Sequence, residues 1–238
     1  MISDDNESWE GTFTPRTNTE DDNNTLSLGT GYTDLAGNNG PDNQTENFEI
    51  DTKAPTVLSV EITDAEGRLT YSGCCSYSSF GFLNAGDNVS VTATFSERIF
   101  IVDNSSGNPT LTLAVGSDNR TATYASGGDN STAMVFRYTI VSGDTDTDGI
   151  NIRANALALP NSSTIKDAAL NNAVLTHSAV SDNSSVKVDT TAPSVDNFTM
   201  SDTELKIGDN ATVTLEFSEP VSVSTSECTR SQTNAANP

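Results

Sequence analysis

An internal repeat constrains the fold of this chain more than any other feature. Residues 48–55 read FEIDTKAP and residues 186–193 read VKVDTTAP, so both carry Asp-Thr-x-Ala-Pro after two alternating apolar residues. Proline, and the residue before it, are held in extended conformations. Each segment is therefore interpreted as the end of a strand followed by a stiff, extended hinge.

Two further motifs recur in the same order along the chain. Residues 86–97 (GDNVSVTATFSE) match residues 208–219 (GDNATVTLEFSE), and an Asp-x-Ala-x-Asn loop occurs at residues 34–38 and again at residues 167–171. The two copies at residues 86–97 and 208–219 lie closer together along the chain than the two Asp-Thr-x-Ala-Pro hinges do. We therefore expect an insertion in the central copy, within residues 64–82.

The repeat predicts tandem units rather than one large domain. Residues 53–190 form one complete unit, residues 1–52 the C-terminal half of a preceding unit, and residues 191–238 the N-terminal half of a following one. Tandem repeats bury their apolar surface within each unit and against its neighbours in the chain. The predicted partners of the central unit are accordingly the neighbouring repeats of the same polypeptide.

Period-two alternation predicts an all-β fold. In residues 88–95, Val89, Val91, Ala93 and Phe95 alternate with polar residues, as in a half-buried strand. Several short strands separated by turn-rich clusters are typical of a β-sandwich. The remaining expected strands of the central unit are residues 57–62, 110–115, 134–140, 149–152, 173–177 and 185–188.

The charge of the chain excludes some partners. Its 33 acidic and 11 basic residues give a net charge of −22, which repels phosphate backbones and anionic membrane surfaces. No apolar stretch is long enough to span a membrane. Dense carboxylates suit Ca²⁺, which prefers oxygen ligands, although an acidic surface also serves solubility alone.

Catalytic and zinc-binding patterns are absent from the sequence. Cys74 and Cys75 are adjacent, Cys228 is the only other cysteine, and His177 is the single histidine, so the ligands of a zinc site are missing. One disulfide from Cys228 to either neighbour would leave an odd thiol. We predict a protein that is not an enzyme, in which His177 is a structural or exposed residue.

Together, the D-T-x-A-P hinge, the G-D-N-x-x-V-T-x-x-F-S-E strand and the D-x-A-G-N loop resemble bacterial immunoglobulin-like repeats. Repeats of that kind build the stalks of large bacterial surface adhesins and biofilm proteins. Residues 9–15 also resemble a strand of these repeats, and residues 111–189 resemble a sister variety that carries an acidic D-T-D-T-D-G turn. The tail at residues 227–238 departs from the resemblance. The resemblance implies an immunoglobulin-like β-sandwich, an extracellular or cell-surface location and a role as a spacer in adhesion.

The sharpest chemical motif is Asp-Thr-Asp-Thr-Asp-Gly at residues 144–149. Carboxylates at alternate positions before a glycine can wrap oxygen ligands around one calcium ion. We therefore predict a Ca²⁺ site formed by Asp144, Asp146 and Asp148. The alternative is an acidic turn with hydrated carboxylates.

The resemblance also implies calcium at the junctions, where acids of the loop, the strand end and the hinge share an ion. A shared ion would freeze the hinge and make neighbouring units a rod. The alternative is that these acids only cap turns. The residues concerned are Asp34, Asp51 and Glu97 at the first junction, and Asp167, Asp189 and Glu219 at the second.

The sequence is compatible with two alternative functions and predicts one kind of self-association. The chain is expected to be a Ca²⁺-rigidified spacer, or alternatively a module that binds a glycan or protein through the aromatic-rich insertion at residues 64–82. The half-units at residues 1–52 and 191–238 would expose sheet edges, which are templates for strand pairing. Head-to-tail self-association through them is a further expectation.

Overall fold

The computed structural model describes residues 8–65, 82–102, 107–160 and 163–221. Every regular element within them is a β-strand, which confirms the predicted all-β class. No helix in this part of the chain is long and apolar enough to cross a membrane. The three cysteines, most of the predicted insertion and the C-terminal tail lie outside the described residues.

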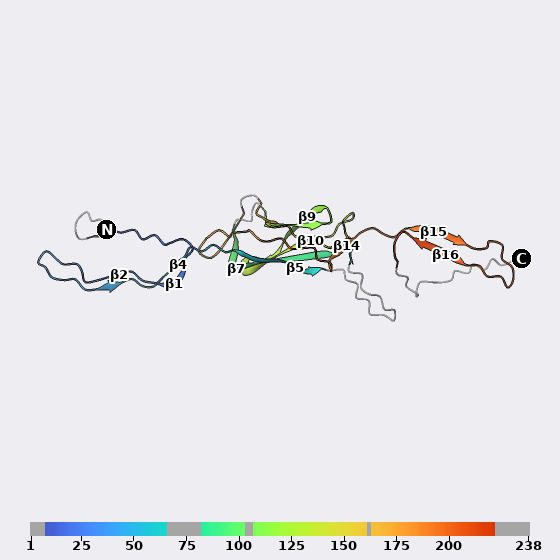
Figure 1. Cartoon of the computed structure of the whole chain (residues 1–238). Helices are drawn as coiled ribbons and strands as arrows, with labels where there is room; N and C mark the ends of the chain where they lie inside the picture. The colour runs from blue at the N-terminus through green and yellow to red at the C-terminus, as the bar shows by residue number, and fades with distance from the viewer. Residues whose placement is uncertain (1–7, 66–81, 103–106, 161–162, 222–238) are drawn as a thin grey trace. The chain divides into compact units, whose positions relative to one another are not determined.

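The chain divides into two compact units, residues 1–190 and residues 191–238. Residues 1–52 thus share a compact unit with the central repeat, and the boundary expected at residue 52 stays a prediction. In the first segment two antiparallel pairs form along one hairpin (Figure 1). They are β1 (Glu20–Asn24) with β4 (Phe48–Asp51), and β2 (Ser27–Leu28) with β3 (Asn43–Gln44).

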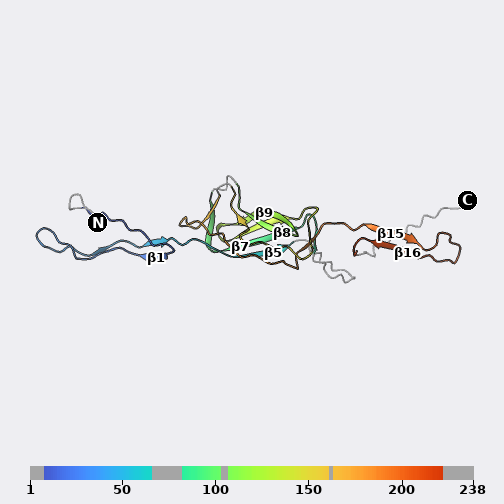
Figure 2. The same ribbon diagram turned by 45° about the horizontal axis from the view of Figure 1, so that its top comes forward.

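The central repeat is built on one large antiparallel sheet, visible in Figure 2. Its strand order is β12-β8-β9-β10-β7-β13, and β5 also pairs with β7. The strands are β5 (Val57–Ala65), β7 (Asn88–Val102), β8 (Thr110–Val115), β9 (Asp118–Gly127), β10 (Asp129–Thr139), β12 (Leu157–Ala158) and β13 (Thr164–Lys166).

A smaller sheet completes the sandwich. It has the order β11-β14-β6, with β11 (Thr145–Asp146), β14 (Lys187–Asp189) and β6 (Phe82–Leu83). Apolar side chains of both sheets share one core, which includes Phe95, Phe136 and Val188. The alternation predicted for residues 88–95 is confirmed, because all four apolar residues of that strand are buried.

The second compact unit repeats the start of the central one. Its strands β15 (Val195–Met200) and β16 (Val213–Phe217) pair antiparallel, and Val195 faces Phe217 as Val57 faces Phe95 in the β5–β7 pair. Both pairs also have a register shift directly after that first pair. The two segments therefore fold alike down to their strand register.

Two expected strands are absent from the described residues, and one long strand is present that the sequence did not predict. Residues 149–152 and 173–177 form isolated bridges instead of strands, because each pairs with a neighbouring segment at only one or two positions. Strand β9 was not expected, since among its ten residues only Ala122 is fully buried. Its pairing with β8 and β10 comes from tight turns at both ends rather than from apolar alternation.

Candidate functional site

Three carboxylates from distant parts of the first compact unit meet at one point. Ligand oxygens of Asp51, Glu97 and Asp167 all lie within 4.8 Å of one another. Asp167 is buried and the other two are half-buried. The group unites the hinge, the end of the repeated strand and the repeated loop.

Glu97 reaches this point because strand β7 changes partner there. The edge of β7 that faces β5 up to Phe95 is taken over by β13 from Phe100 onward. On the other edge, the register with β10 shifts between Thr94 and Ile99, so the residues between them form a bulge. Bulges re-aim side chains, and this one holds an acid between the buried Phe95 and Ile99.

The loop after β13 supplies Asp167. One Asp167 oxygen accepts a hydrogen bond from the backbone N–H of Asn171 and the other from its side-chain amide, each at 2.8 Å. The loop is thus closed on itself around the carboxylate. Because β13 pairs with β7 up to Lys166, Asp167 follows directly at the strand end beside Glu97.

The hinge supplies Asp51, the last residue of β4. The side-chain amide of Asn171 donates to the Asp51 carbonyl at 3.2 Å, which ties the hinge to the loop of the central repeat. Beyond it, Lys53 forms a 2.7 Å ion pair with Glu20, the residue opposite Asp51 in strand β1. Lys53, whose charge acts on Glu97, is thereby engaged by an acid outside the cluster.

The electrostatics of the cluster are unfavourable without a further positive charge. Burial raises the pKa of Glu97, and the charges of Asp51 and Asp167 raise it further, against a smaller opposing effect of Lys53. Like charges at such distances disfavour ionisation. The arrangement is chemically suited to a hard divalent cation, which prefers carboxylate oxygens and would remove this repulsion.

The sequence grouped these acids differently. It placed Asp34 with Asp51 and Glu97, whereas the structure places Asp167 there. Asp34 instead accepts hydrogen bonds from Ala36 and Asn38 within its own exposed loop, which lowers its pKa. The D-x-A-x-N motif marks both loops as candidates and does not distinguish them, since both loops carry it.

The residues expected at the second junction lie in different compact units. Asp189 closes β14 opposite Thr145, and Glu219 follows β16. One Glu219 carboxylate oxygen is buried without a hydrogen-bond partner in the described part of the chain. A cation shared by Asp189 and Glu219 stays a prediction, and Asp167 belongs to the first cluster.

The acidic turn at residues 144–149 has its own network of protein donors. Asp144 accepts hydrogen bonds from Arg120 at 2.7 Å, from the Val141 amide at 3.0 Å and from Tyr138. Asp146 accepts from the amides of Gly116 at 2.7 Å and Gly149 at 2.6 Å.

The first two carboxylates of the turn therefore have a structural role. Asp144 and Asp146 are buried, with every oxygen bonded to a donor, while Asp148 is exposed. Burial alone would raise the pKa of Asp144, but hydrogen bonds from Tyr138, Val141 and Arg120 outweigh it and lower the pKa. Asp144 and Asp146 are therefore not hydrated carboxylates. Among the described residues, the three acids of the turn also do not converge on one point. Arg120, its counter-ion, was not singled out by the sequence.

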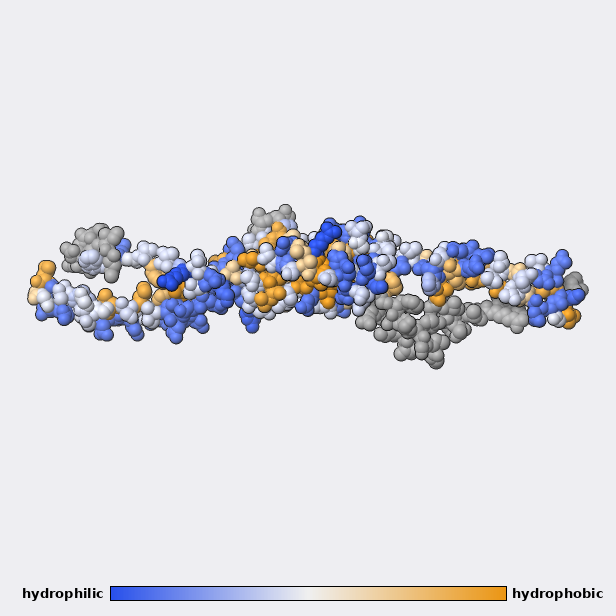
Figure 3. Space-filling model, viewed as in Figure 1, coloured by the Kyte–Doolittle hydropathy of each residue, from blue (hydrophilic) through white to orange (hydrophobic). Residues whose placement is uncertain are grey.

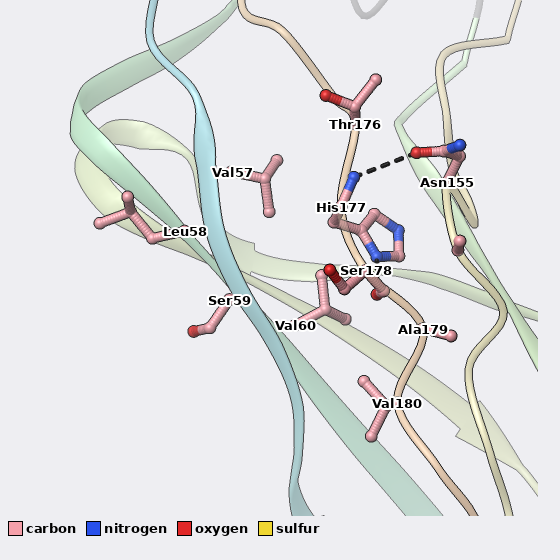
Figure 4. Close-up of a pocket in the computed structure, with 11 residues that line it drawn as sticks. Val57, Leu58, Ser59, Val60, Asn155, Thr176, His177, Ser178, Ala179 and Val180 are labelled. Carbon is pink, nitrogen blue, oxygen red and sulfur yellow. Dashed lines mark hydrogen bonds between the residues drawn. The ribbon is translucent and has the colours of Figure 1, made fainter.

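A shallow groove lies between β5 and residues 176–180 and contains His177 (Figure 4). The Nε2 atom of His177 accepts a hydrogen bond from the Ala156 amide at 2.8 Å, so Nδ1 carries the proton shared with the Ser178 carbonyl. The His177 amide also donates to Asn155. The histidine thus fastens two loop segments together, as expected of a structural residue.

Comparison with known proteins supports the fold assignment. Residues 1–50 match the family model described as Bacterial Ig-like domain. Domains of that family are non-enzymatic, structural and typically extracellular. No curated protein and no solved structure matches the chain.

Proposed function

We propose that this chain is a spacer segment of a bacterial surface adhesin, in which a calcium ion stiffens the hinge between consecutive immunoglobulin-like repeats. The observation that carries the proposal is the cluster of Asp51, Glu97 and Asp167. Its ligands come from the hinge that enters the central repeat and from two elements of that repeat. A cation held there would restrain the hinge directly.

The surroundings of the cluster fit a cation. Asn171 holds the Asp167 carboxylate by two hydrogen bonds, and the Lys53 amide donates to the Asp51 carboxylate at 3.0 Å, so two of the three carboxylates are positioned before any ion binds. Preorganised ligands lose less conformational entropy on binding. Carbonyl and amide oxygens at the hinge would add to the carboxylates, since calcium takes six to eight oxygen ligands.

The charge of the chain suits a spacer that must stay soluble in an extended array. A net charge of −22 favours the solubility of a long array of repeats. Binding of a glycan through the insertion at residues 64–82 is left without a supporting contact, since residues 66–81 lie outside the described part.

Thermal unfolding with and without calcium tests the proposal. A ligand that binds only the folded state raises the melting temperature. We expect calcium to raise it for the natural chain and to have little effect on Glu97→Gln. Asp148→Asn is the matched control, because it removes one exposed carboxylate from the other acidic motif.

Each result discriminates between the two acidic motifs. If Asp148→Asn abolished the calcium response and Glu97→Gln kept it, the ion would belong to the turn at residues 144–149. No response in the natural chain would remove the cation from the proposal. If calcium does raise the melting temperature, small-angle X-ray scattering should show that the hinge at residues 51–55 becomes less variable on calcium addition, as a spacer requires.

A further inference from the structure

The first D-T-x-A-P hinge begins with a threonine whose hydroxyl is fastened to the segment before it. The Thr52 hydroxyl donates a hydrogen bond to the Arg16 carbonyl at 2.7 Å and accepts one from the Thr19 amide at 2.9 Å. A hydroxyl group can donate and accept at the same time. Thr52 therefore attaches the start of the hinge to the loop that leads into β1.

The second hinge begins in the same way. The Thr190 hydroxyl donates to the Asp144 carbonyl and accepts from the Gly143 amide, each at 2.9 Å. The two loops hold equivalent positions, because each leads into the strand that pairs with the end of the hinge strand, β1 with β4 and β11 with β14. Both loops also carry a residue with a left-handed backbone, Asn18 in the first and Gly143 in the second. The same threonine of the repeated motif thus makes the same kind of attachment twice.

The residue after each hinge proline is fastened to the repeat that follows. The Ser96 hydroxyl accepts from the Thr56 amide at 2.9 Å, and the Ser96 amide donates to the Thr56 carbonyl at 2.8 Å. Ser218 and Ser194 form the same two bonds, at 2.9 and 3.0 Å. Both serines belong to the repeated Phe-Ser-Glu motif. The end of each hinge is therefore attached through a hydroxyl, as its start is.

Three residues lie between the two attachments of each hinge, residues 53–55 in the first and 191–193 in the second. The proline and the residue before it have little conformational freedom. Burial contributes little to the second hinge, since residues 191–193 are exposed and the apolar surface in Figure 3 gathers mainly over the central repeat. The hydroxyl bonds at the two ends then matter more, because they fix where the hinge begins and ends.

We propose that the hinge hydroxyls are clamps, which confine bending between consecutive repeats to the three residues between them. Thr52 and Thr190 act as positioning residues at the start of the hinges, and Ser96 and Ser218 at their ends. Without its hydroxyl, the threonine itself becomes free to turn and the hinge lengthens. None of the four clamps uses a carboxylate, so they act independently of the proposed calcium site.

Backbone relaxation and amide exchange, measured by NMR on the 238-residue chain in chelator, test the clamps. In the natural chain, lowered order parameters at the second hinge should be limited to the amides of residues 191 and 192. Thr190→Val removes the hydroxyl at nearly constant shape, so the lowered values should extend back to position 190. Exchange of the Gly143 amide should become roughly five- to tenfold faster.

Three further variants make the result specific. Thr190→Ser keeps the hydroxyl and should behave like the natural chain, as should Thr214→Val, an exposed position on β16. Thr52→Val should act on the first hinge and on the Thr19 amide, and should leave the second hinge unchanged. Ser218→Ala should extend the motion forward to position 194.

The serine variant decides between a clamp and a general loss of stability. Equal order parameters at position 190 in Thr190→Val and Thr190→Ser would overturn the proposal, and so would motion that extends into β14 in the natural chain. Protection of the Val91 and Phe136 amides in every variant shows that the core stays folded. Because chelator is present throughout, a missing calcium site would change none of these outcomes.

Discussion

Leu170 adopts the left-handed backbone conformation that Gly37 adopts at the equivalent position of the other D-x-A-x-N loop. Its φ is 69°, against 88° for Gly37. In both loops the next residue is the asparagine that binds the loop aspartate through its backbone and side-chain N–H groups. The loop of the central repeat therefore holds Leu170, a residue with a Cβ atom, in an unfavourable backbone conformation.

Replacing Leu170 by glycine should stabilise the central repeat. The left-handed conformation costs a non-glycine residue about 1–2 kcal/mol, more than the additional chain entropy of glycine, about 0.5–1 kcal/mol. The Leu170 side chain is exposed, so little burial is lost. We expect Leu170→Gly to raise the free energy of unfolding in urea, and Ala168→Gly in the same loop to lower it. An equal loss in both variants would contradict this account.

The ion pair between Arg120 and Asp144 should be among the most sensitive points of the core. The Asp144 side chain is fully buried, and the Arg120 Nε atom lies 2.7 Å from it. Removing one partner of a buried pair leaves an uncompensated charge, at a cost of about 3 kcal/mol. We expect Arg120→Met to lose about that much in chemical unfolding, and Arg137→Met, an exposed position on β10, to change stability by less than about 0.5 kcal/mol.

The hydroxyl of Tyr138 should make the fold sensitive to alkaline pH. Burial, together with its hydrogen bond to Asp144, raises the pKa of Tyr138 to about 12. An unfolded tyrosine titrates near 10, so the folded state keeps a proton that the unfolded state releases. The stabilisation is complete below about pH 10 and is lost as the pH rises toward 12. Unfolding free energies measured across this window should fall steeply for the natural chain and less for Tyr138→Phe.

Much of the fold was accessible from the sequence because the repeat sets its register. Three ordered motifs and the alternation around Val91 were sufficient for the class and for several strands. Strand β9 escaped prediction because its neighbours, not its own apolar pattern, hold it in the sheet. A period-two pattern also over-predicts strands where, as near Ile152, a segment meets its neighbour at one bridge only.

The sequence analysis named the acids of the candidate site but assigned them to two different junctions. All three of its acids were identified, yet the sequence does not say whether the loop before the hinge or the loop after Glu97 reaches it. That choice depends on β13 pairing with the far end of β7, a contact between distant segments. The role of Asp144 was missed for a similar reason, since its partner Arg120 lies on another strand.

Glu97 should make the cation-free protein less stable as the pH rises. Its raised pKa means that the folded state holds a proton which the unfolded state has released. The contribution is therefore present below the ordinary glutamate value and is lost as the pH rises through the folded pKa. Asp144, whose pKa is lowered, acts in the opposite sense, so the natural chain alone does not isolate the effect.

The difference in unfolding free energy between the natural chain and Glu97→Gln isolates it. With chelator present, the variant should gain stability relative to the natural chain as the pH rises from about 4 to 7. Glu61→Gln, an exposed position on β5, serves as the matched control and should show no such trend. With calcium present the sign should reverse, because the natural chain then binds an ion that the variant binds weakly. A difference that is independent of pH in chelator would show that the three carboxylates do not interact.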